Sequence, residues 1–146
     1  CGLDFSAHAC TLIENYVDEF NTFPNLELIV YGRAVAMHSK YCPLKRLDMC
    51  GECKKHKFAL KDKFATFPLL FNSDCTIQVL NSKALNIMDD LSSLNGVNYF
   101  RLVFTTESAS EVKEIITSFM RKLNGDNLKL FDPNKNTRGH FIKNPL

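Results

Sequence analysis

Four cysteines in one part of the chain could hold a metal. Three of the six cysteines, Cys42, Cys50 and Cys53, fall within twelve residues, and Cys75 follows after a gap of 21 residues. Two thiolates at Cys-x2-Cys spacing can bind one ion where the turn between them is tight, and Gly51 supplies the freedom for such a turn. Clustering of this kind favours metal or redox chemistry in a reducing compartment. The pattern therefore predicts a metal site on Cys42, Cys50, Cys53 and Cys75.

The identity of the metal is left open by the spacing. Zinc takes four thiolates in a tetrahedral arrangement and orders the loop that supplies them. A [4Fe–4S] cluster also takes four cysteines, and a proline after a cysteine, as at Cys42 and Pro43, occurs beside iron–sulfur ligands. Reduced structural thiols are a third interpretation. A redox pair of Cys50 and Cys53 is disfavoured, because no helix start of the thioredoxin kind follows them.

Basic residues surround the cysteines. Over residues 33–63 there are nine Lys and Arg against three Asp and Glu, although the net charge of the whole chain is only +2. A basic loop around a metal site suits an anionic partner such as RNA. The same charges would also offset those of bound thiolates, or form an ordinary solvated surface.

Composition limits the class of protein. The chain has 146 residues, 45% of them hydrophobic, which predicts a single domain over residues 1–146. No stretch approaches the roughly 18 consecutive apolar residues of a membrane helix. Six cysteines are too few for a disulfide scaffold, so we expect a cytoplasmic protein with no membrane partner. The start at Cys1, without a Met or a signal-peptide core, indicates a piece of a longer protein.

Hydrophobic periodicity predicts the elements that position the cysteines. The expected order is a helix at 10–20, a buried strand at 26–31, a long functional loop at 33–57, β pieces at 57–62, 67–71 and 75–80, a helix at 82–94, a strand at 99–104, and a helix capped by Ser108. Pro68 would put its strand at an edge or a bulge. The last helix should bury a stripe made of Val112, Ile115, Ile116, Phe119, Met120 and Leu123.

Strands that alternate with helices suggest parallel βα units. There are too few strands to close a barrel. The fold class that we expect is therefore α/β: a partial TIM-type (β/α) barrel, comprising its last βα units, with a small antiparallel insert after the cysteine-rich loop. Part of such a sheet would leave unpaired edges, so we also expect a homodimer through an edge, or coverage of the edge by the tail.

Short motifs, taken in order, resemble the peptidase U32 family. They are Val30-Tyr31-Gly32-Arg33, Tyr41-Cys42-Pro43-Leu44, Cys50-x2-Cys53, Leu60-Lys61-Asp62, Phe67-Pro68, Cys75, Asn81-Ser82 and Asn136-Thr137-Arg138-Gly139-His140-Phe141. The resemblance spans about residues 26 to 142. It implies a TIM-type barrel, and members that hydroxylate RNA bases or ubiquinone precursors hold an iron–sulfur cluster on four cysteines. On matching positions the ligands are Cys42, Cys50 and Cys53, with Cys75 as the best fourth.

The sequence departs from the family pattern at two places. Ala34, Val35 and Ala36 stand where several cluster-bearing members have a further cysteine, and the spacing of Cys50 and Cys53 is tighter than in some relatives. The family name comes from collagenase-like members, so the resemblance also implies a peptidase, a hydrolase. However, the chain shows no nucleophile elbow, no HExxH motif and no residue that we would assign as a protease nucleophile.

Three functions follow as hypotheses. The first is a metal-dependent enzyme that acts on RNA bases or a small aromatic substrate, with a [4Fe–4S] cluster or, alternatively, zinc. The second is a collagenase-like peptidase. The third is a zinc-stabilised module that binds RNA or a partner, such as a paired U32 subunit, without catalysis. Candidate contacts to an anion or substrate are Arg33, His38, Arg138 and His140.

Overall fold

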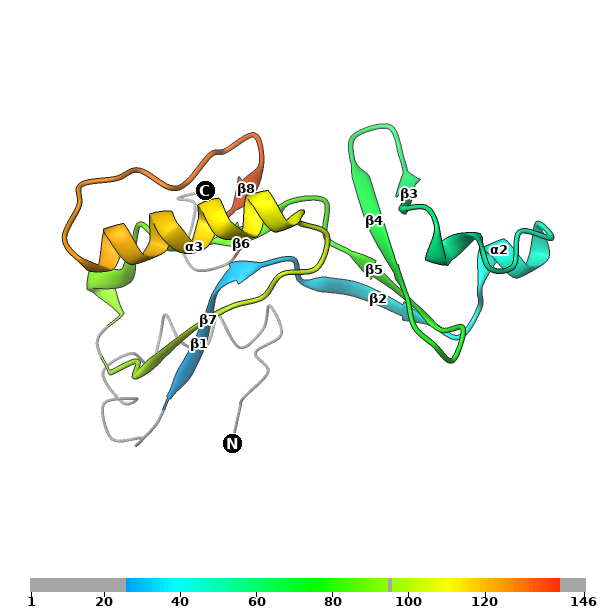
Figure 1. Cartoon of the computed structure of the whole chain (residues 1–146), viewed down its shortest axis with the longest axis horizontal. Coiled ribbons are helices and arrows are strands. Elements are labelled where there is room, and N and C mark those ends of the chain that lie inside the picture. Colours follow the sequence, from blue (N-terminus) through cyan, green and yellow to red (C-terminus); the bar gives the residue numbers. More distant parts are fainter. Residues whose placement is uncertain (1–25, 95, 140–146) are drawn as a thin grey trace, which may run out of the picture. The chain divides into compact units, whose positions relative to one another are not determined.

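The computed structural model describes residues 26–94 and 96–139, with the backbone alone at Ser93 (Figure 1). The helix expected at 10–20 lies outside the described residues. The described elements are β1 (Glu27–Gly32), β2 (Val35–Ser39), α2 (Pro43–Arg46), η1 (Glu52–Lys54), β3 (Phe58–Lys61), β4 (Thr66–Phe71), β5 (Ile77–Leu80), β6 (Ala84–Asn86), η2 (Leu91–Ser93), β7 (Tyr99–Leu102), α3 (Ala109–Leu123) and β8 (Asn136–Thr137). None of the helices among these residues is long and apolar enough to cross a membrane.

Internal contacts divide the described chain into two compact units. The first unit contains residues 26–32 and those from 83 onward, and the second contains residues 33–82. Each unit has its own four-stranded sheet. The prediction of one domain over residues 1–146 stays a prediction.

The first unit is built on β1. Its sheet has the order β7-β1-β6-β8, in which β1 pairs in parallel with β7 and antiparallel with β6, and β6 pairs in parallel with β8. Leu28 and Val30 on β1 are 2% and 0% exposed, as the apolar run of a buried strand requires. The buried strand predicted at 26–31 and the strand predicted at 99–104 are both present, the latter as the shorter β7.

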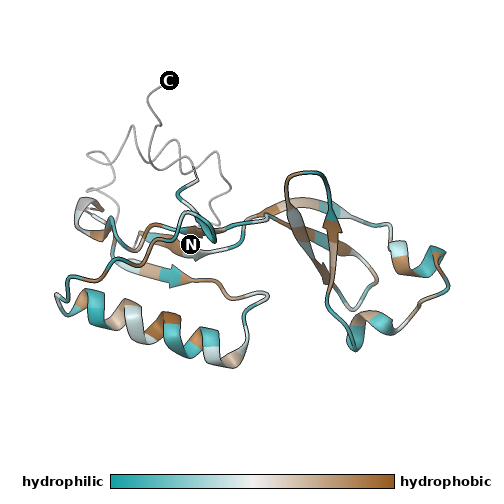
Figure 2. Cartoon of the chain, turned by 90° about the horizontal axis from the view of Figure 1, so that it is seen from above, coloured by the Kyte–Doolittle hydropathy of each residue, from teal (hydrophilic) through white to brown (hydrophobic). Residues whose placement is uncertain are grey.

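Helix α3 lies against one face of this sheet (Figures 1 and 2). The predicted capping box is confirmed, because the Ser108 hydroxyl accepts a hydrogen bond from the backbone N–H of Glu111 and the Glu111 carboxylate accepts one from the backbone N–H of Ser108. The Phe119 ring packs edge-on against Phe100 of β7, with 6.3 Å between the ring centroids. The apolar face of α3 therefore packs against the strands.

The apolar stripe of α3 is wider than the surface that the sheet covers. Phe119 is buried and Ile115 packs against the same core, whereas Ile116, Met120 and Leu123 are 41%, 51% and 47% exposed. The prediction that all six stripe residues are buried is thus wrong for these three in the described part of the chain.

The helix predicted at 82–94 is wrong, since this segment forms β6 and η2. Asn86, which is 2% exposed, shows why. Its side-chain amide donates to the Leu130 carbonyl and to Asn136 Oδ1, and its Oδ1 accepts from the backbone N–H of Met88. The two long-range bonds, to Leu130 and Asn136, hold the backbone extended beside β1 and β8, and so they outweigh the helical spacing of the apolar residues.

The second unit is an antiparallel sheet of order β2-β5-β4-β3. The β pieces predicted at 57–62, 67–71 and 75–80 correspond to β3, β4 and β5. Its small core consists of Leu69, Ile77 and Val79, and phenylalanines of β3 and β4 pack against it. The segment 33–57 is more regular than predicted, because it begins with β2 and includes α2 and η1.

Pro68 lies in a central strand, contrary to the prediction of an edge or bulge. β4 pairs with β3 on one side and with β5 on the other. However, the pairing with β5 begins only at Leu69, and Pro68 itself is opposite Ala59 of β3. The proline therefore stands where the strand has a single neighbour, which is the local condition that it needs.

The predicted partial (β/α) barrel is wrong. The described residues form two sheets with eight strands in total and a single helix longer than four residues, which is a β-rich architecture. A barrel requires a helix after each parallel strand. Here β1 is followed directly by β2, and β6 by the short η2.

Gly32, at the end of β1, is a position where we expect substitution to be costly. Its φ is +147°, and an added Cβ would lie 2.7 Å from the Val103 carbonyl oxygen and 2.8 Å from Val103 Cβ. Gly32→Ala should therefore lower the free energy of unfolding by about 3 kcal/mol or more. Gly125→Ala is the matched control, with φ +96° but open space around it, and should cost about 1 kcal/mol in denaturant unfolding. Equal losses in the two variants would contradict the close approach of Val103.

Asp89 binds the segment that follows α3, through the backbone N–H groups of Leu130 and Phe131. Burial raises the pKa of its carboxyl group, but hydrogen bonds from the backbone N–H groups of Leu130 and Phe131, and the Lys122 ammonium, lower it by more, so that the net pKa lies below 3.8. The stability that these contacts contribute is present above the unfolded value of 3.8 and is lost as pH falls through the lower folded value.

The variant Asp89→Asn tests the contribution of this carboxylate. The free energy of unfolding of this variant should be about 1–3 kcal/mol lower than that of the wild type at pH 7, because an amide nitrogen replaces one acceptor oxygen. Its stability should also decline less than that of the wild type as pH falls below 3.8. Asp126→Asn, which breaks an exposed pair with Arg121, is the control and should change stability by less than about 1 kcal/mol. If Asp89→Asn lost stability below pH 3.8 as the wild type does, the Asp89 carboxylate would not be the group that holds this segment.

Candidate functional site

The second unit carries the four candidate ligands, each in a short turn or helix end. Cys42 is the N-cap residue of α2, with Pro43 at the start of the helix, and its side chain makes no capping hydrogen bond. Cys53 lies in η1, and Cys50 lies in the turn before it. Gly51 has φ +94°, which is the left-handed geometry that the predicted tight turn between Cys50 and Cys53 needs.

Backbone hydrogen bonds give the segment between β2 and β3 its form. The N–H groups of Leu47 and Met49 donate to the Leu44 carbonyl, and the N–H of Glu52 donates to the Met49 carbonyl. Leu44 is 5% exposed and anchors α2. The segment thus has local backbone order of its own, in addition to any order that a bound metal would give it.

Cys75 does not begin a strand as predicted; it lies in the turn from β4 to β5. Its φ is +63°, which residues with a side chain seldom adopt. The turn is fixed by the N–H of Asn72 donating to the Thr76 carbonyl and the N–H of Cys75 donating to the Asn72 carbonyl. The Asp74 carboxylate accepts from the Thr76 hydroxyl and backbone N–H, which together lower the pKa of Asp74.

Strand register brings these turns to one end of the sheet. Ile77 of β5 lies opposite Ser39, the last residue of β2, and opposite Phe71, the last residue of β4. Cys42 comes three residues after Ser39, and Cys75 comes two residues before Ile77. The segment that holds Cys42, Cys50 and Cys53 ends at β3, which begins near this end of the sheet with Phe58 opposite Leu69. All four cysteines therefore belong to segments attached to the same end of the second sheet.

The thiols are available but are not gathered around one point. All four cysteines are free; Cys50 and Cys75 are exposed, and Cys42 and Cys53 are partly buried. Within residues 26–94 and 96–139, no group of three or more His, Cys, Asp or Glu side chains is placed to hold a metal ion. The donor types thus fit zinc or an iron–sulfur cluster, while the tetrahedral arrangement that either needs is not formed.

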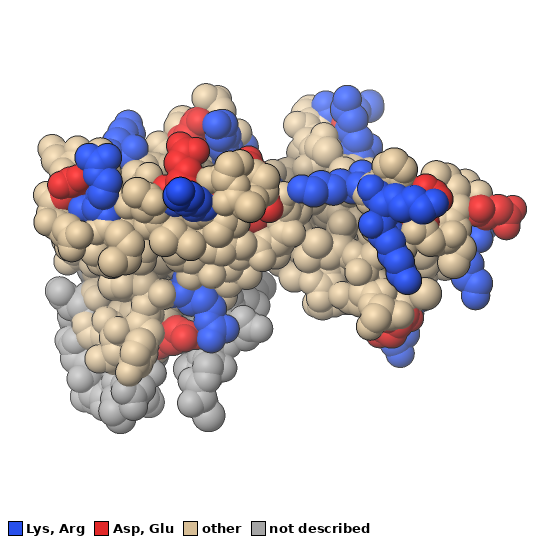
Figure 3. Space-filling model, viewed as in Figure 1, with Lys and Arg blue, Asp and Glu red and all other residues tan. Residues whose placement is uncertain are grey.

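Positive charge is concentrated in the second unit. Residues 33–82 hold nine Lys and Arg against four Asp and Glu, an excess of five. On the face drawn in Figure 3, blue side chains predominate over this unit. Glu52 offsets part of the charge near Cys53, because its carboxylate lies 2.8 Å from Lys55 Nζ and 3.5 Å from His56 Nε2.

Among the candidate anion contacts, Arg33 and His38 belong to the second unit and Arg138 to the first. Arg33 donates from Nη1 to the carbonyl groups of Asn81 and Ser82, where it ties the two ends of the second unit together. His38 is exposed on β2 opposite Gln78.

Arg138, in the first unit, has structural contacts of its own. Its guanidinium lies over the Phe131 ring at 4.7 Å from the centroid, and its Nε is 3.4 Å from Asp90 Oδ2. His140 lies outside the described residues. The structure thus gives Arg33 and Arg138 structural contacts, and the proposed anion contacts stay predictions.

One strongly exposed residue is not among the predicted site residues. Phe64, in the turn from β3 to β4, is 94% exposed. The sequence marks the turn itself, through Asp62 and Lys63. It does not show that the phenylalanine ring stands in water, since phenylalanines at such positions usually fold back onto a core.

Comparisons with protein-family models, with curated proteins and with solved structures found no match to this chain.

Proposed function

We propose that the second unit is the metal-binding part of a peptidase U32-type protein, with Cys42, Cys50, Cys53 and Cys75 as ligands. The observation that supports this most is the shared end of the sheet: the pairings of β2 and β4 with β5 bring the start of the segment that holds Cys42, Cys50 and Cys53 next to the turn that holds Cys75, and all four thiols are free. An iron–sulfur cluster is the species that the resemblance implies, and an RNA base or a small aromatic molecule is the substrate class.

Binding requires the thiols to approach one another. Cys50 and Cys75 are exposed in turns, so their side chains can reorient without opening the small core of Leu69, Ile77 and Val79. The two partly buried cysteines sit on short helical turns, which would make them the more fixed half of the site.

The surrounding charge suits this role. Thiolates are the metal-binding form of cysteine, and four of them carry more negative charge than a single metal ion neutralises. The excess of five positive charges over residues 33–82 would lower the cost of forming them. When bound, an iron–sulfur cluster would supply redox chemistry; the chain itself would supply the ligands and a basic surface for an anionic substrate.

Metal analysis of the chain purified without oxygen tests the proposal. Iron and acid-labile sulfide with the visible absorption of a cluster are expected in the wild type. Cys42→Ser, Cys50→Ser, Cys53→Ser and Cys75→Ser should each lose most of the metal, whereas Cys10→Ser, the matched control, should keep it. One equivalent of zinc with the same pattern of losses would favour the zinc-stabilised module. Metal retention in all four variants, or no bound metal in the wild type, would contradict the proposal.

Thiol modification of the metal-free chain offers a second test. In a background where Cys1 and Cys10 are replaced by Ser, the exposed Cys50 and Cys75 should react with iodoacetamide faster than the partly buried Cys42 and Cys53. Added metal should protect all four together. Protection of only two cysteines would limit the site to a pair.

A further inference from the structure

Phe64 is the most exposed large hydrophobic residue in the described part of the chain. Its exposed fraction is 94%, against 65% for the next, Leu47. The ring belongs to the turn of residues 62–65, which joins β3 to β4. Because the side chain is not buried, it contributes almost nothing to the stability of the second unit. Stability therefore does not explain why a phenylalanine occupies this position.

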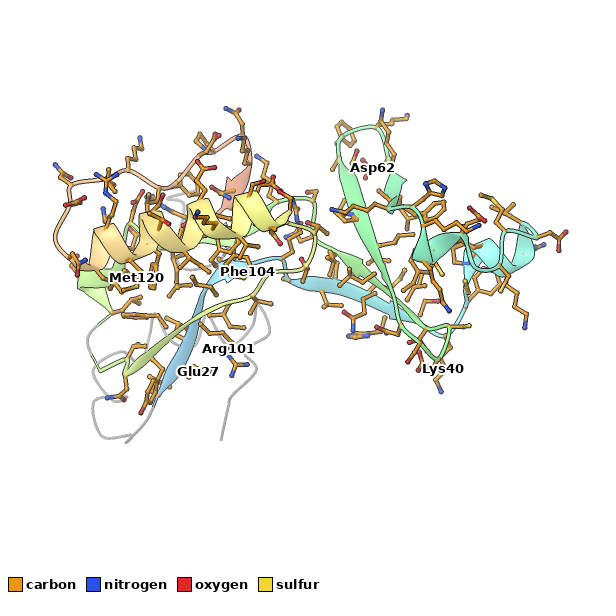
Figure 4. The ribbon with its side chains drawn as sticks, viewed as in Figure 1. Glu27, Lys40, Asp62, Arg101, Phe104 and Met120 are labelled. Atoms are coloured by element: carbon orange, nitrogen blue, oxygen red, sulfur yellow. The ribbon has the colours of Figure 1, made fainter. Side chains whose placement is uncertain are left out.

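The backbone beneath the ring is fixed. Asp62 Oδ1 accepts hydrogen bonds of 2.7 Å from the backbone N–H groups of both Phe64 and Ala65, and the N–H of Asp62 donates to the Ala65 carbonyl at 3.0 Å. Figure 4 shows Asp62 at this tip of the second unit. The ring is therefore presented on a preformed turn, and a ligand that stacks on it would not have to order the backbone.

Two lysines lie just before Phe64 in the sequence. Lys61 is the last residue of β3, opposite Thr66, and Lys63 lies inside the turn; both are exposed. An exposed aromatic ring with exposed lysines in the same short segment is a combination with which proteins hold single-stranded nucleic acid, since an unpaired base stacks on the ring and phosphates pair with the cations.

We propose that the turn of residues 62–65 is a contact for single-stranded RNA, in which one unpaired base stacks on Phe64 and the flanking phosphates pair with Lys61 and Lys63. A membrane surface fits the turn less well, because one ring offers little apolar area for insertion.

The contact is separate from the turn of Cys75. β4, with six residues, runs from the turn of residues 62–65 to the turn that holds Cys75, so these two turns are about 20 Å apart. In Figure 4, Asp62 marks one end of the sheet and Lys40, which follows β2, marks the other. The choice of RNA deepens the proposed function and rests on it for the substrate class, but the binding contact does not require a metal.

Fluorescence anisotropy with a labelled oligouridine and the full chain tests the contact. Phe64→Ala should weaken binding about 5- to 150-fold, the range for loss of one stacked base. Phe64→Trp should keep it. Tyr99→Ala, which removes a 56% exposed aromatic residue from the first unit, is the matched control and should bind as the wild type does. Lys61→Gln with Lys63→Gln should reduce the slope of log K against log salt by about 1.4. Thermal unfolding should be the same for wild type and Phe64→Ala.

The outcomes separate this contact from the metal site. Loss of oligouridine binding in Phe64→Ala with unchanged metal content supports the contact, and unchanged binding in Cys75→Ser shows its independence. Wild-type affinity in Phe64→Ala, or no oligouridine binding by the wild type at low salt, would overturn the proposal while leaving the metal site untouched. Binding to phosphatidylserine vesicles that depends on Phe64, without oligouridine binding, would assign the turn to a membrane and would also overturn it.

Discussion

The pairing of β5 with both β2 and β4 is the constraint on which the candidate site depends. Ile77 lies between Ser39 and Phe71, so the chain leaves β2 and turns from β4 to β5 at one place. Cys42 and Cys75, which are far apart in the sequence, belong to neighbouring segments for that reason. A shift of register by one residue would turn Ile77 and Val79 out of the small core, so the burial of these two side chains maintains the arrangement.

The first unit is held by different means. β1 has a strand on each side, and Gly32 at its end allows the backbone of Val103 to approach more closely than any side chain would permit. The chain that follows α3 returns along the unit through polar contacts, with Asn86 and Asp89 binding its backbone. Two buried or nearly buried polar side chains thus set the path of a segment that has few apolar residues of its own.

Some of the fold was predictable from local signals. The capping box at Ser108 and Glu111 is complete within four residues, and the apolar run of β1 needs a buried position wherever it is placed. The segment 82–94 was not predictable in the same way, because its helical spacing is overruled by the long-range bonds of Asn86. The exposure of Ile116 and Met120 on α3 depends equally on what the rest of the chain covers, which periodicity does not report.

In the candidate site, too, some features follow from local sequence signals and others from contacts with the rest of the chain. Gly51 could be assigned to a tight turn from its place between Cys50 and Cys53, and its left-handed φ agrees. The place of Cys75 in a turn, with φ +63°, follows from the bonds around Asn72 and Thr76, and alternation along residues 75–80 wrongly included it in the strand. Nothing in the sequence indicated that Phe64 stands in water, because exposure is set by the direction of the hairpin.

X-ray absorption of the metal-loaded chain would count the ligand atoms around the metal and so test the four-cysteine site itself. We expect four sulfur ligands around zinc, at about 2.3 Å, or, around iron, cysteine sulfur together with bridging sulfide. Each of the four cysteine-to-serine variants should lose one sulfur or the metal itself. A metal surrounded mainly by nitrogen and oxygen, with a sulfur count unaffected by the loss of Cys75, would rule out the four-cysteine site.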